Sequence, residues 1–250
     1  MNNNAIFLPV HLETKPTNNF SYHELSARAT ELDLLPMSNS SRSKISSYTG
    51  WVKENFPNHF SPKILAHVKN GFVQRLVRWD KPEGSPIFDF SYLEGTKRIT
   101  EISHESSGHK SDFFHGHCRR WHANGVLAME SDHSNGFING FYKLWSDRGQ
   151  LIEFSQCMNG KYHGDRFIFE ENKSVLLTSD HCWAKYSYST GQTHGPFHKW
   201  HTNSKIWLTG ENRNGKIHGM LSEYNEDGFR VFKTMYQDGR EIWSRLAFGH

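Results

Sequence analysis

The stretches NGKYHG at 159–164 and NGKIHG at 214–219 differ at one position and lie 55 residues apart. Two looser relatives, NGFING at 135–140 and TGQTHG at 190–195, lie before and between them. Short motifs that recur at a regular spacing indicate an array of similar units, in which each unit buries its apolar face against its neighbours. The sequence therefore predicts a repeat protein.

The last glycine of each motif belongs to a regular series, which we call the anchoring glycines. They are Gly116, Gly140, Gly164, Gly195 and Gly219, at steps of 24, 24, 31 and 24 residues. We place the seven extra residues of the long step within 178–190. An aromatic residue stands five positions after each anchoring glycine, namely Trp121, Trp145, Phe169, Trp200 and Tyr224. We predict that the glycines meet backbone requirements of turns and that the aromatic residues pack in the core of each unit.

Asparagine or aspartate before glycine divides each unit further. These pairs favour type I′ hairpin turns, because both central residues of that turn need a positive φ. They stand at 124–125, 135–136, 159–160, 214–215, 227–228 and 238–239. Two turns in each period leave two strands of about six to eight residues, so each unit is predicted to be a β-hairpin. In the long unit, the apolar residues 175–177 are the expected second strand.

The predicted fold class is all-β: an elongated antiparallel meander of stacked 24-residue β-hairpin repeats with a small helical N-terminal segment. The array is expected to cover 66–250, with degenerate first units. Residues 1–65 are expected to form a separate cap or partner-binding segment. Its apolar spacing predicts a helix at 21–35, and a second short helix is expected at 49–56.

Composition limits the classes of function. The chain has 29 basic and 26 acidic residues, a net charge of +3, which gives no argument for nucleic-acid binding. Its three cysteines form no CxxC pair, so a disulfide framework is not expected and a reducing compartment is. No signal sequence or membrane helix is evident, and we expect a soluble, cytoplasmic protein without a cofactor.

Histidines recur at one position of the units and raise the question of metal or catalytic chemistry. His115, His163, His194 and His218 each precede an anchoring glycine, and Asn139 replaces them once. Equivalent positions on stacked hairpins lie too far apart to share one ion, so we expect these side chains to pack or hydrogen-bond locally.

Two denser groups leave minor alternatives open. His115, His117 and His122 lie near Cys118, which permits a zinc site or a thiol nucleophile, although no carboxylate or second cysteine completes either. His181, Cys182 and Trp183 lie in the expected insertion, where a hydrolase site is the third alternative for function. No known catalytic motif is present, so the chain is not expected to be an enzyme.

Alternation along each first strand separates two faces. The second and fourth residues after an anchoring glycine point away from the repeated aromatic. This second face mixes aromatic, apolar and basic groups, which is typical of protein recognition. The candidate partner-binding residues on it are Arg120, Tyr142, Arg166, Phe197 and Lys199. The opposite assignment of core and outer face stays open, because both faces carry apolar residues.

The repeated glycine–aromatic spacing with NGxxHG at the joints resembles the MORN-type (membrane occupation and recognition nexus) repeat, most closely the variant in bacterial antitoxin-like proteins. The likeness covers residues 112–243 and, more weakly, 70–111. It implies a curved β-sheet that binds partners and has no catalytic residues, with an antitoxin or immunity-type protein that blocks a toxin or effector as the leading function. The alternative that it implies is a scaffold or membrane-surface protein on anionic lipid.

Overall fold

A computed structural model of the chain describes residues 35–36, 46–82, 84, 86–98, 114–169 and 182–246. Within these ranges every regular element is a β-strand. The chain divides into two compact units, which are described separately. The first unit holds the described residues up to 140 together with 147–149, and the second holds 141–146 and the described residues from 150 onward.

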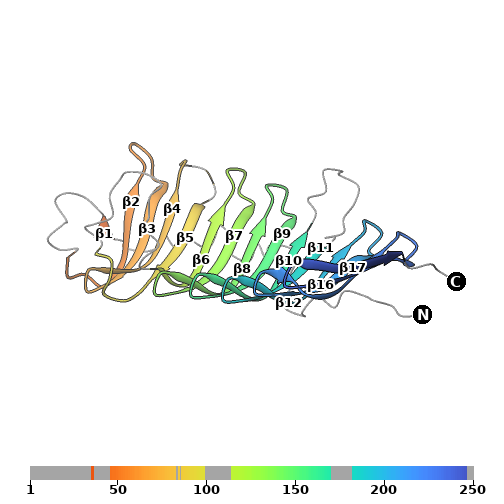
Figure 1. The fold of residues 1–250 in the computed structure, drawn as a ribbon. Coiled ribbons are helices and arrows are strands. Elements are labelled where there is room, and N and C mark those ends of the chain that lie inside the picture. Colours follow the sequence, from red (N-terminus) through yellow and green to blue (C-terminus); the bar gives the residue numbers. More distant parts are fainter. Residues whose placement is uncertain are drawn as a thin grey trace. The chain divides into compact units, whose positions relative to one another are not determined.

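The first unit is an antiparallel meander in which strands that follow one another in the chain lie side by side (Figure 1). A two-residue strand, β1, pairs with β2 in parallel. The strands are β1 (Leu35–Pro36), β2 (Gly50–Asn55), β3 (Pro62–Lys69), β4 (Phe72–Trp79), β5 (Pro86–Tyr92), β6 (Phe114–Trp121) and β7 (Leu127–Ser134). The next strand, β8 (Phe137–Trp145), begins in this unit and continues in the second.

The second unit repeats this antiparallel pairing along the chain. Its strands are β9 (Leu151–Met158), β10 (Lys161–Phe169), β11 (Cys182–Ser189), β12 (Gln192–Trp200), β13 (Ile206–Arg213), β14 (Lys216–Ile217), β15 (Gly219–Tyr224), β16 (Arg230–Gln237) and β17 (Arg240–Leu246). The all-β antiparallel meander expected from the sequence is therefore confirmed in each unit.

The predicted type I′ turns are confirmed at four of the six Asn-Gly and Asp-Gly pairs. Both residues have positive φ at 135–136, 159–160, 214–215 and 238–239. The prediction is wrong at 124–125 and 227–228, where only the glycine has positive φ. There the turn is longer: His122 donates its N–H to the carbonyl of Val126, and Asn225 donates to Phe229. In this longer turn a single left-handed residue is enough to close the loop.

Four of the five anchoring glycines lie inside strands and Gly219 begins β15, so the expectation that they meet turn requirements is wrong. Gly164, for example, has a φ of 94° within β10. Tyr162 pairs with Cys157 and Arg166 with Ser155, so β10 has two more residues than β9 in this interval. Such a bulge bends the strand and increases its twist, and glycine supplies the left-handed backbone that the bend needs.

A second irregularity lies opposite the repeated aromatics. Trp200 pairs with Ile206 while Lys199 pairs with Leu208, which leaves Trp207 as an extra residue. The same register shift occurs before Trp121, Phe169 and Tyr224. Of the five repeated aromatics, Trp145, Phe169 and Trp200 are buried, and Trp121 and Tyr224 are half-buried.

The short helix expected at 49–56 is wrong, because these residues form β2, which pairs with β3 along its whole length. Val52 is fully buried in this pairing, and tertiary burial of a β-branched residue outweighs a weak helical pattern. The expected boundary between residues 65 and 66 falls inside β3. The helix expected at 21–35 lies outside the described residues.

The position of the insertion also differs from the prediction. Residues 182–189 form β11, which pairs with β10 on one side and β12 on the other. The strand that completes this hairpin is therefore the segment that we assigned to the insertion. The residues expected to form it, 175–177, lie outside the described residues.

Candidate protein-interaction site

Three of the five candidate residues share one face of the second unit. Arg166 lies opposite Tyr186 on β11, and Tyr186 lies opposite Phe197 on β12. The rings of Tyr186 and Phe197 stack with centroids 5.8 Å apart. Lys199 stands two residues after Phe197 on the same strand and therefore on the same face. The alternation predicted from the sequence correctly groups these residues.

Phe197 belongs to the packed part of this face, because only 4% of its surface is exposed. Its ring lies over Gly210, its cross-strand neighbour on β13. A Cβ atom on Gly210 would stand 2.9 Å from the Phe197 ring and 2.9 Å from Cδ1 of Leu221. The missing side chain at 210 therefore makes room for Phe197, whose role is packing within the sheet.

Arg166 is held by an ion pair inside the protein. Its Nε and Nη2 atoms donate to the two oxygens of Glu153 at 3.0 and 2.8 Å. Ser155 and Tyr162 donate to the same carboxylate, which is nearly buried. Burial alone would raise the pKa of Glu153, but the hydrogen bonds from Arg166 and Ser155 outweigh burial and lower it. This guanidinium is largely neutralised by its own sheet.

Lys199 is the candidate residue whose ammonium group lies beside two tryptophan rings. Its Nζ lies 5.0 Å from the ring centroid of Trp183 and 5.5 Å from that of Trp207. Both indoles occupy extra residues of bulges, on the strands that flank β12. Trp207 also donates from Nε1 to Glu223 at 3.4 Å. An ammonium group between two indole rings combines cation–π attraction with a wide aromatic surface, and all three side chains are partly exposed.

Trp183 and Trp207 were not predicted as members of this site. Trp183 was placed in the expected insertion, and Trp207 was not among the candidate residues. The sequence does contain a shared feature that could have grouped the two tryptophans. Each is the second residue of its strand, in Cys182-Trp183-Ala184 and in Ile206-Trp207-Leu208. Without the register of the bulges, alternation places both indoles on the wrong face.

The remaining two candidates are on other strands. Tyr142 is half-buried on β8. Arg120 is exposed on β6 in the first unit, between Phe88 on β5 and Met129 on β7. Its face of that unit also holds the main apolar core, a cross-strand row of Val52, Ala66, Leu76, Phe90 and Cys118.

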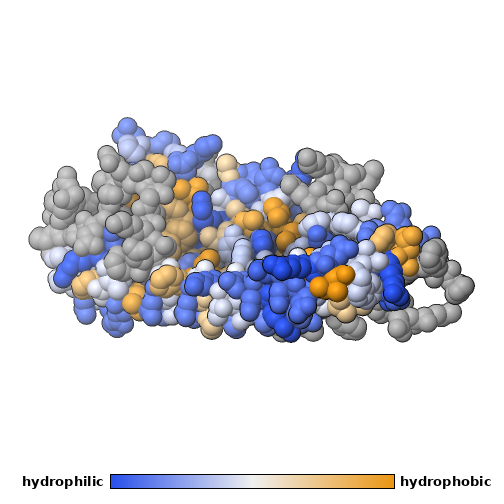
Figure 2. Space-filling view, in the orientation of Figure 1, coloured by the Kyte–Doolittle hydropathy of each residue, from blue (hydrophilic) through white to orange (hydrophobic). Residues whose placement is uncertain are grey.

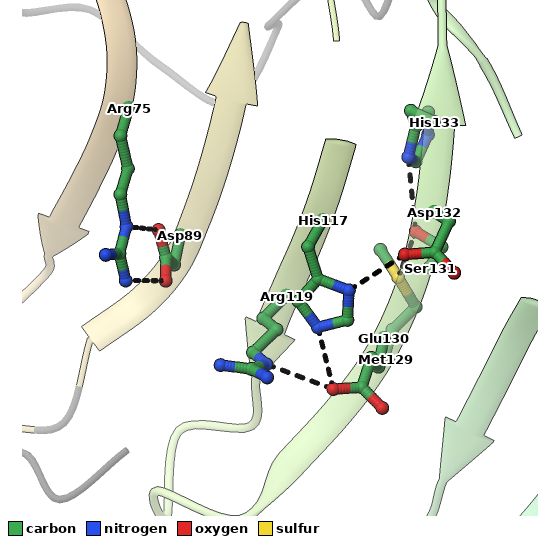
Figure 3. A network of polar contacts seen from close by, with 9 residues as sticks. All are labelled: Arg75, Asp89, His117, Arg119, Met129, Glu130, Ser131, Asp132 and His133. Carbon is green, nitrogen blue, oxygen red and sulfur yellow. Dashed lines mark hydrogen bonds and ion pairs between the residues drawn. The ribbon is translucent and has the colours of Figure 1, made fainter. Parts of the chain in front are cut away.

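The opposite face of the first unit carries a network of charged residues (Figure 3). Arg75 donates from two nitrogens to the carboxylate of Asp89, at 2.8 and 2.7 Å. On the next two strands His117 lies between the carboxylates of Glu130 and Asp132, at 2.8 and 3.0 Å. Opposite charges thus face one another across these strands, and each carboxylate has a cationic partner.

Charge pairing shifts the titration of this network. Hydrogen bonds to Asp132 and Glu130 raise the pKa of His117 to about 9, so the ring is charged at neutral pH. Burial alone would raise the pKa of Glu130, but hydrogen bonds from His117 and Arg119 hold it at about 2. A positively charged His117 donates from both ring nitrogens and cannot act as a general base or as a metal ligand.

The cysteines considered as nucleophiles are buried. Burial raises the pKa of the Cys118 thiol and of the Cys182 thiol to about 12, so neither supplies a thiolate at neutral pH. His181 lies outside the described residues. Among the described residues, no group of three or more histidine, cysteine, aspartate or glutamate side chains has a geometry that could hold a metal ion.

The repeated histidines connect successive hairpins. Nδ1 of His194 accepts from the backbone N–H of Asn214 at 3.5 Å, and Nδ1 of His163 accepts from that of Thr190 at 3.5 Å. Directly before β2, Thr49 takes this role, because its Oγ1 accepts from the N–H of Asn70 at 2.9 Å. Hydrogen bonds are thus found at His163 and His194, but the expectation that they are local is wrong, because each reaches the turn of the next hairpin.

Comparison with known proteins leaves the geometry as the main guide to function. No family model matches the chain, and no curated protein shows significant similarity to it. In the part of the chain that the structure describes, no helix is long and apolar enough to cross a bilayer.

Proposed function

We propose that this chain is a non-enzymatic protein-binding repeat protein, most specifically an antitoxin or immunity-type inhibitor that docks on a toxin or effector. The single observation that carries the proposal is the placement of Lys199 between Trp183 and Trp207 on a sheet face. Tryptophan is among the residues that dominate binding energy in protein interfaces, and an ammonium group beside exposed indole rings adds a charged contact to that surface.

Successive hairpins are fastened to one another, which supports a preorganised binding surface. The turn glycines Gly191, Gly215 and Gly239 each donate their N–H to a carbonyl of the preceding hairpin, at 2.8 to 2.9 Å. Together with the histidine bonds, these contacts are consistent with stacked repeats of 24 residues. A surface that is already ordered loses little conformational entropy on binding.

The charge of the site favours an acidic or neutral partner. The chain carries a net charge of +3, and the binding group contributes an ammonium between aromatic rings. Complementary charge speeds association and excludes partners of like charge. An inhibitor of a strongly basic toxin would need the opposite charge, so we expect the partner to contact the site through acidic or apolar groups.

Affinity capture from the source cells with the full chain as bait tests the proposal. Bound proteins are identified by mass spectrometry, for the unaltered chain and for variants Lys199→Met and Trp207→Ala. Lys205→Glu is the matched control, because Lys205 is exposed on the turn before the same strand, β13. The proposal predicts one stoichiometric protein that both site variants lose and the control retains.

The outcomes separate the alternatives. Toxicity of the captured protein expressed alone, relieved by this chain, would establish the inhibitor role. Equal capture by all variants would move the binding site elsewhere. Absence of any protein partner, with recovery of anionic lipid, would replace the proposal with the membrane-surface alternative. The full chain is needed, because a start at residue 66 would remove β2 from the first unit.

A further inference from the structure

Two cations on the last strands of the second unit lie directly opposite one another. Lys233 on β16 pairs in register with Arg245 on β17. Like charges in this position repel and weaken strand pairing. Trp243 lies on the same face, with its ring centroid 5.9 Å from Nζ of Lys233 and 5.5 Å from Cζ of Arg245. Both cations are therefore within cation–π distance of the same indole ring.

Several other cations of the sheet have a carboxylate partner, which this pair does not have in the part of the chain that the structure describes. Lys185 occupies the same cross-strand row and forms an ion pair with Asp165 at 2.7 Å. Arg75, Arg119 and Arg166 also have carboxylate partners. Lys233 and Arg245 contact no carboxylate among the described residues, although Lys233 is half-buried. Two adjacent cations without an anion leave a position that a carboxylate would fill favourably.

The surroundings favour a protein as the source of that carboxylate. On the site's own face the apolar group beside the two cations is the indole of Trp243. Phe232 and Leu246, which pair with one another, are 37% and 57% exposed on the other face of the same two strands. Figure 2 shows hydrophobic residues among hydrophilic ones over the last strands. Binding to anionic lipid favours clusters of about four to eight basic residues, and two cations are too few for tight binding to nucleic acid. An indole and two cations on one face offer apolar and charged contacts together, which suits a protein surface.

We propose that Lys233, Arg245 and Trp243 bind an acidic side chain of a protein partner, with Trp243 packing against the alkyl part of that side chain. This site and Lys199 lie on opposite faces of the sheet. Phe232 is in the same cross-strand row as Leu208 and Lys199. Lys233 is the next residue along β16, so its side chain points to the other face. It rests on the proposed function only in that the chain binds a protein, and it adds the chemistry of the partner's contact.

A direct binding measurement tests the site without the partner. The probe is a fluorescein-labelled peptide of about ten glutamates, titrated with the full chain and followed by anisotropy at low and at high salt. The test variant is Lys233→Glu with Arg245→Glu. The matched control is Arg213→Glu with Lys216→Glu, which reverses another directly opposed cation pair. Among the described residues, no indole ring lies over either of these two cations. Both variants change the net charge equally.

We expect the test variant to lower affinity about tenfold or more and the control to change it less than about twofold. Trp243→Leu, which keeps both charges, should lower affinity to an intermediate degree, and thermal melts check that every variant is folded. Equal losses in test and control variants would overturn the proposal, as would binding to phosphatidylserine vesicles or to an oligothymidine strand but not to the peptide. The capture experiment uses variants of the other face, so either proposal can fail alone.

Discussion

Nδ1 of His218 lies 3.1 Å from Oδ1 of Asp238 and 3.3 Å from its backbone nitrogen. This contact spans 20 residues and links β14–β15 to the turn of the last hairpin. A single ring nitrogen cannot donate to the carboxylate and accept from the N–H at the same time. The protonation of His218 therefore decides which of the two bonds connects the hairpins.

His218→Ala tests the value of this connection. Loss of one partly exposed hydrogen bond should lower the free energy of unfolding by about 1 kcal/mol. Asparagine stands at the equivalent position 139, and its amide can both donate and accept. His218→Asn should therefore recover most of the loss in urea unfolding. Equal destabilisation by both variants would show that the ring packs and that its nitrogen does not matter.

Gly210→Ala should destabilise the second unit by about 2 kcal/mol, because the added methyl overlaps Phe197 and Leu221. Replacing Phe197 with leucine as well should reduce the penalty, since the smaller side chain frees part of that space. A double-mutant cycle in urea measures the coupling. Additive effects of the two substitutions would contradict the packing role assigned to Gly210.

Arg166→Met should lower the free energy of unfolding by about 3 kcal/mol, because it leaves the carboxylate of Glu153 nearly buried without its cation. Glu153→Gln together with Arg166→Met should cost less than Arg166→Met alone. Chemical denaturation near neutral pH is the measurement. A smaller loss in the single variant than in the double variant would mean that water reaches Glu153 in the folded protein.

The charged network of the first unit predicts a dependence of stability on pH. The pKa of His117 is raised to about 9, so its contribution is full below the ordinary histidine value near 6.5 and is lost as pH rises through about 9. The pKa of Glu130 is lowered to about 2, so its contribution is full above about 4.5 and is lost as pH falls toward 2.

Thermal melts between pH 5 and pH 10, chosen to bracket about 6.5 and about 9, test this on the unaltered chain and on His117→Gln. The unaltered chain should lose stability on the alkaline side, and the difference between the two proteins should shrink there. Glutamine does not titrate, which makes this variant the control for all other groups. A constant difference across the range would refute the charged state of His117.

Removal of residues 1–65 should unfold or strongly destabilise the first unit. The truncation removes β2 and the first half of β3, and exposes Ala66 and Val68 in the rest of β3. It also deletes the bonds from Asn70 and Gly71 to Thr49 and Tyr48. We expect the cooperative thermal transition of that unit to be lost, and circular dichroism during heating measures this. An unchanged melting profile would support the boundary at 65–66 that the sequence suggested.

Local chemistry explains why the turns were predictable. A two-residue hairpin turn needs a positive φ at both of its central residues, and few residue types tolerate this. The turns at Asn135-Gly136 and Asn159-Gly160 could therefore be predicted from the sequence. The prediction of a type I′ turn was wrong for the pairs at 124–125 and 227–228, because loop length depends on where the flanking strands pair. That pairing is set by contacts outside the four residues of the turn.

The candidate site was predicted only in part for the same reason. Alternation grouped Arg166, Phe197 and Lys199 on one face, since a strand has a period of two. It could not show that Phe197 is buried, that Arg166 is neutralised by Glu153, or that bulges turn Trp183 and Trp207 toward Lys199. Each of these depends on a residue in a neighbouring strand.

By itself the sequence determined the β-hairpin meander, the positions of most turns and the repetition of glycine and aromatic residues, because backbone torsion preferences and strand alternation act over a few residues. Only the tertiary structure decided that β2 belongs with β3, that residues 182–189 are a strand, and that the anchoring glycines bend strands. Strand register depends on hydrogen bonds and side-chain packing between segments distant in the chain, and a local pattern carries no information on which segments meet.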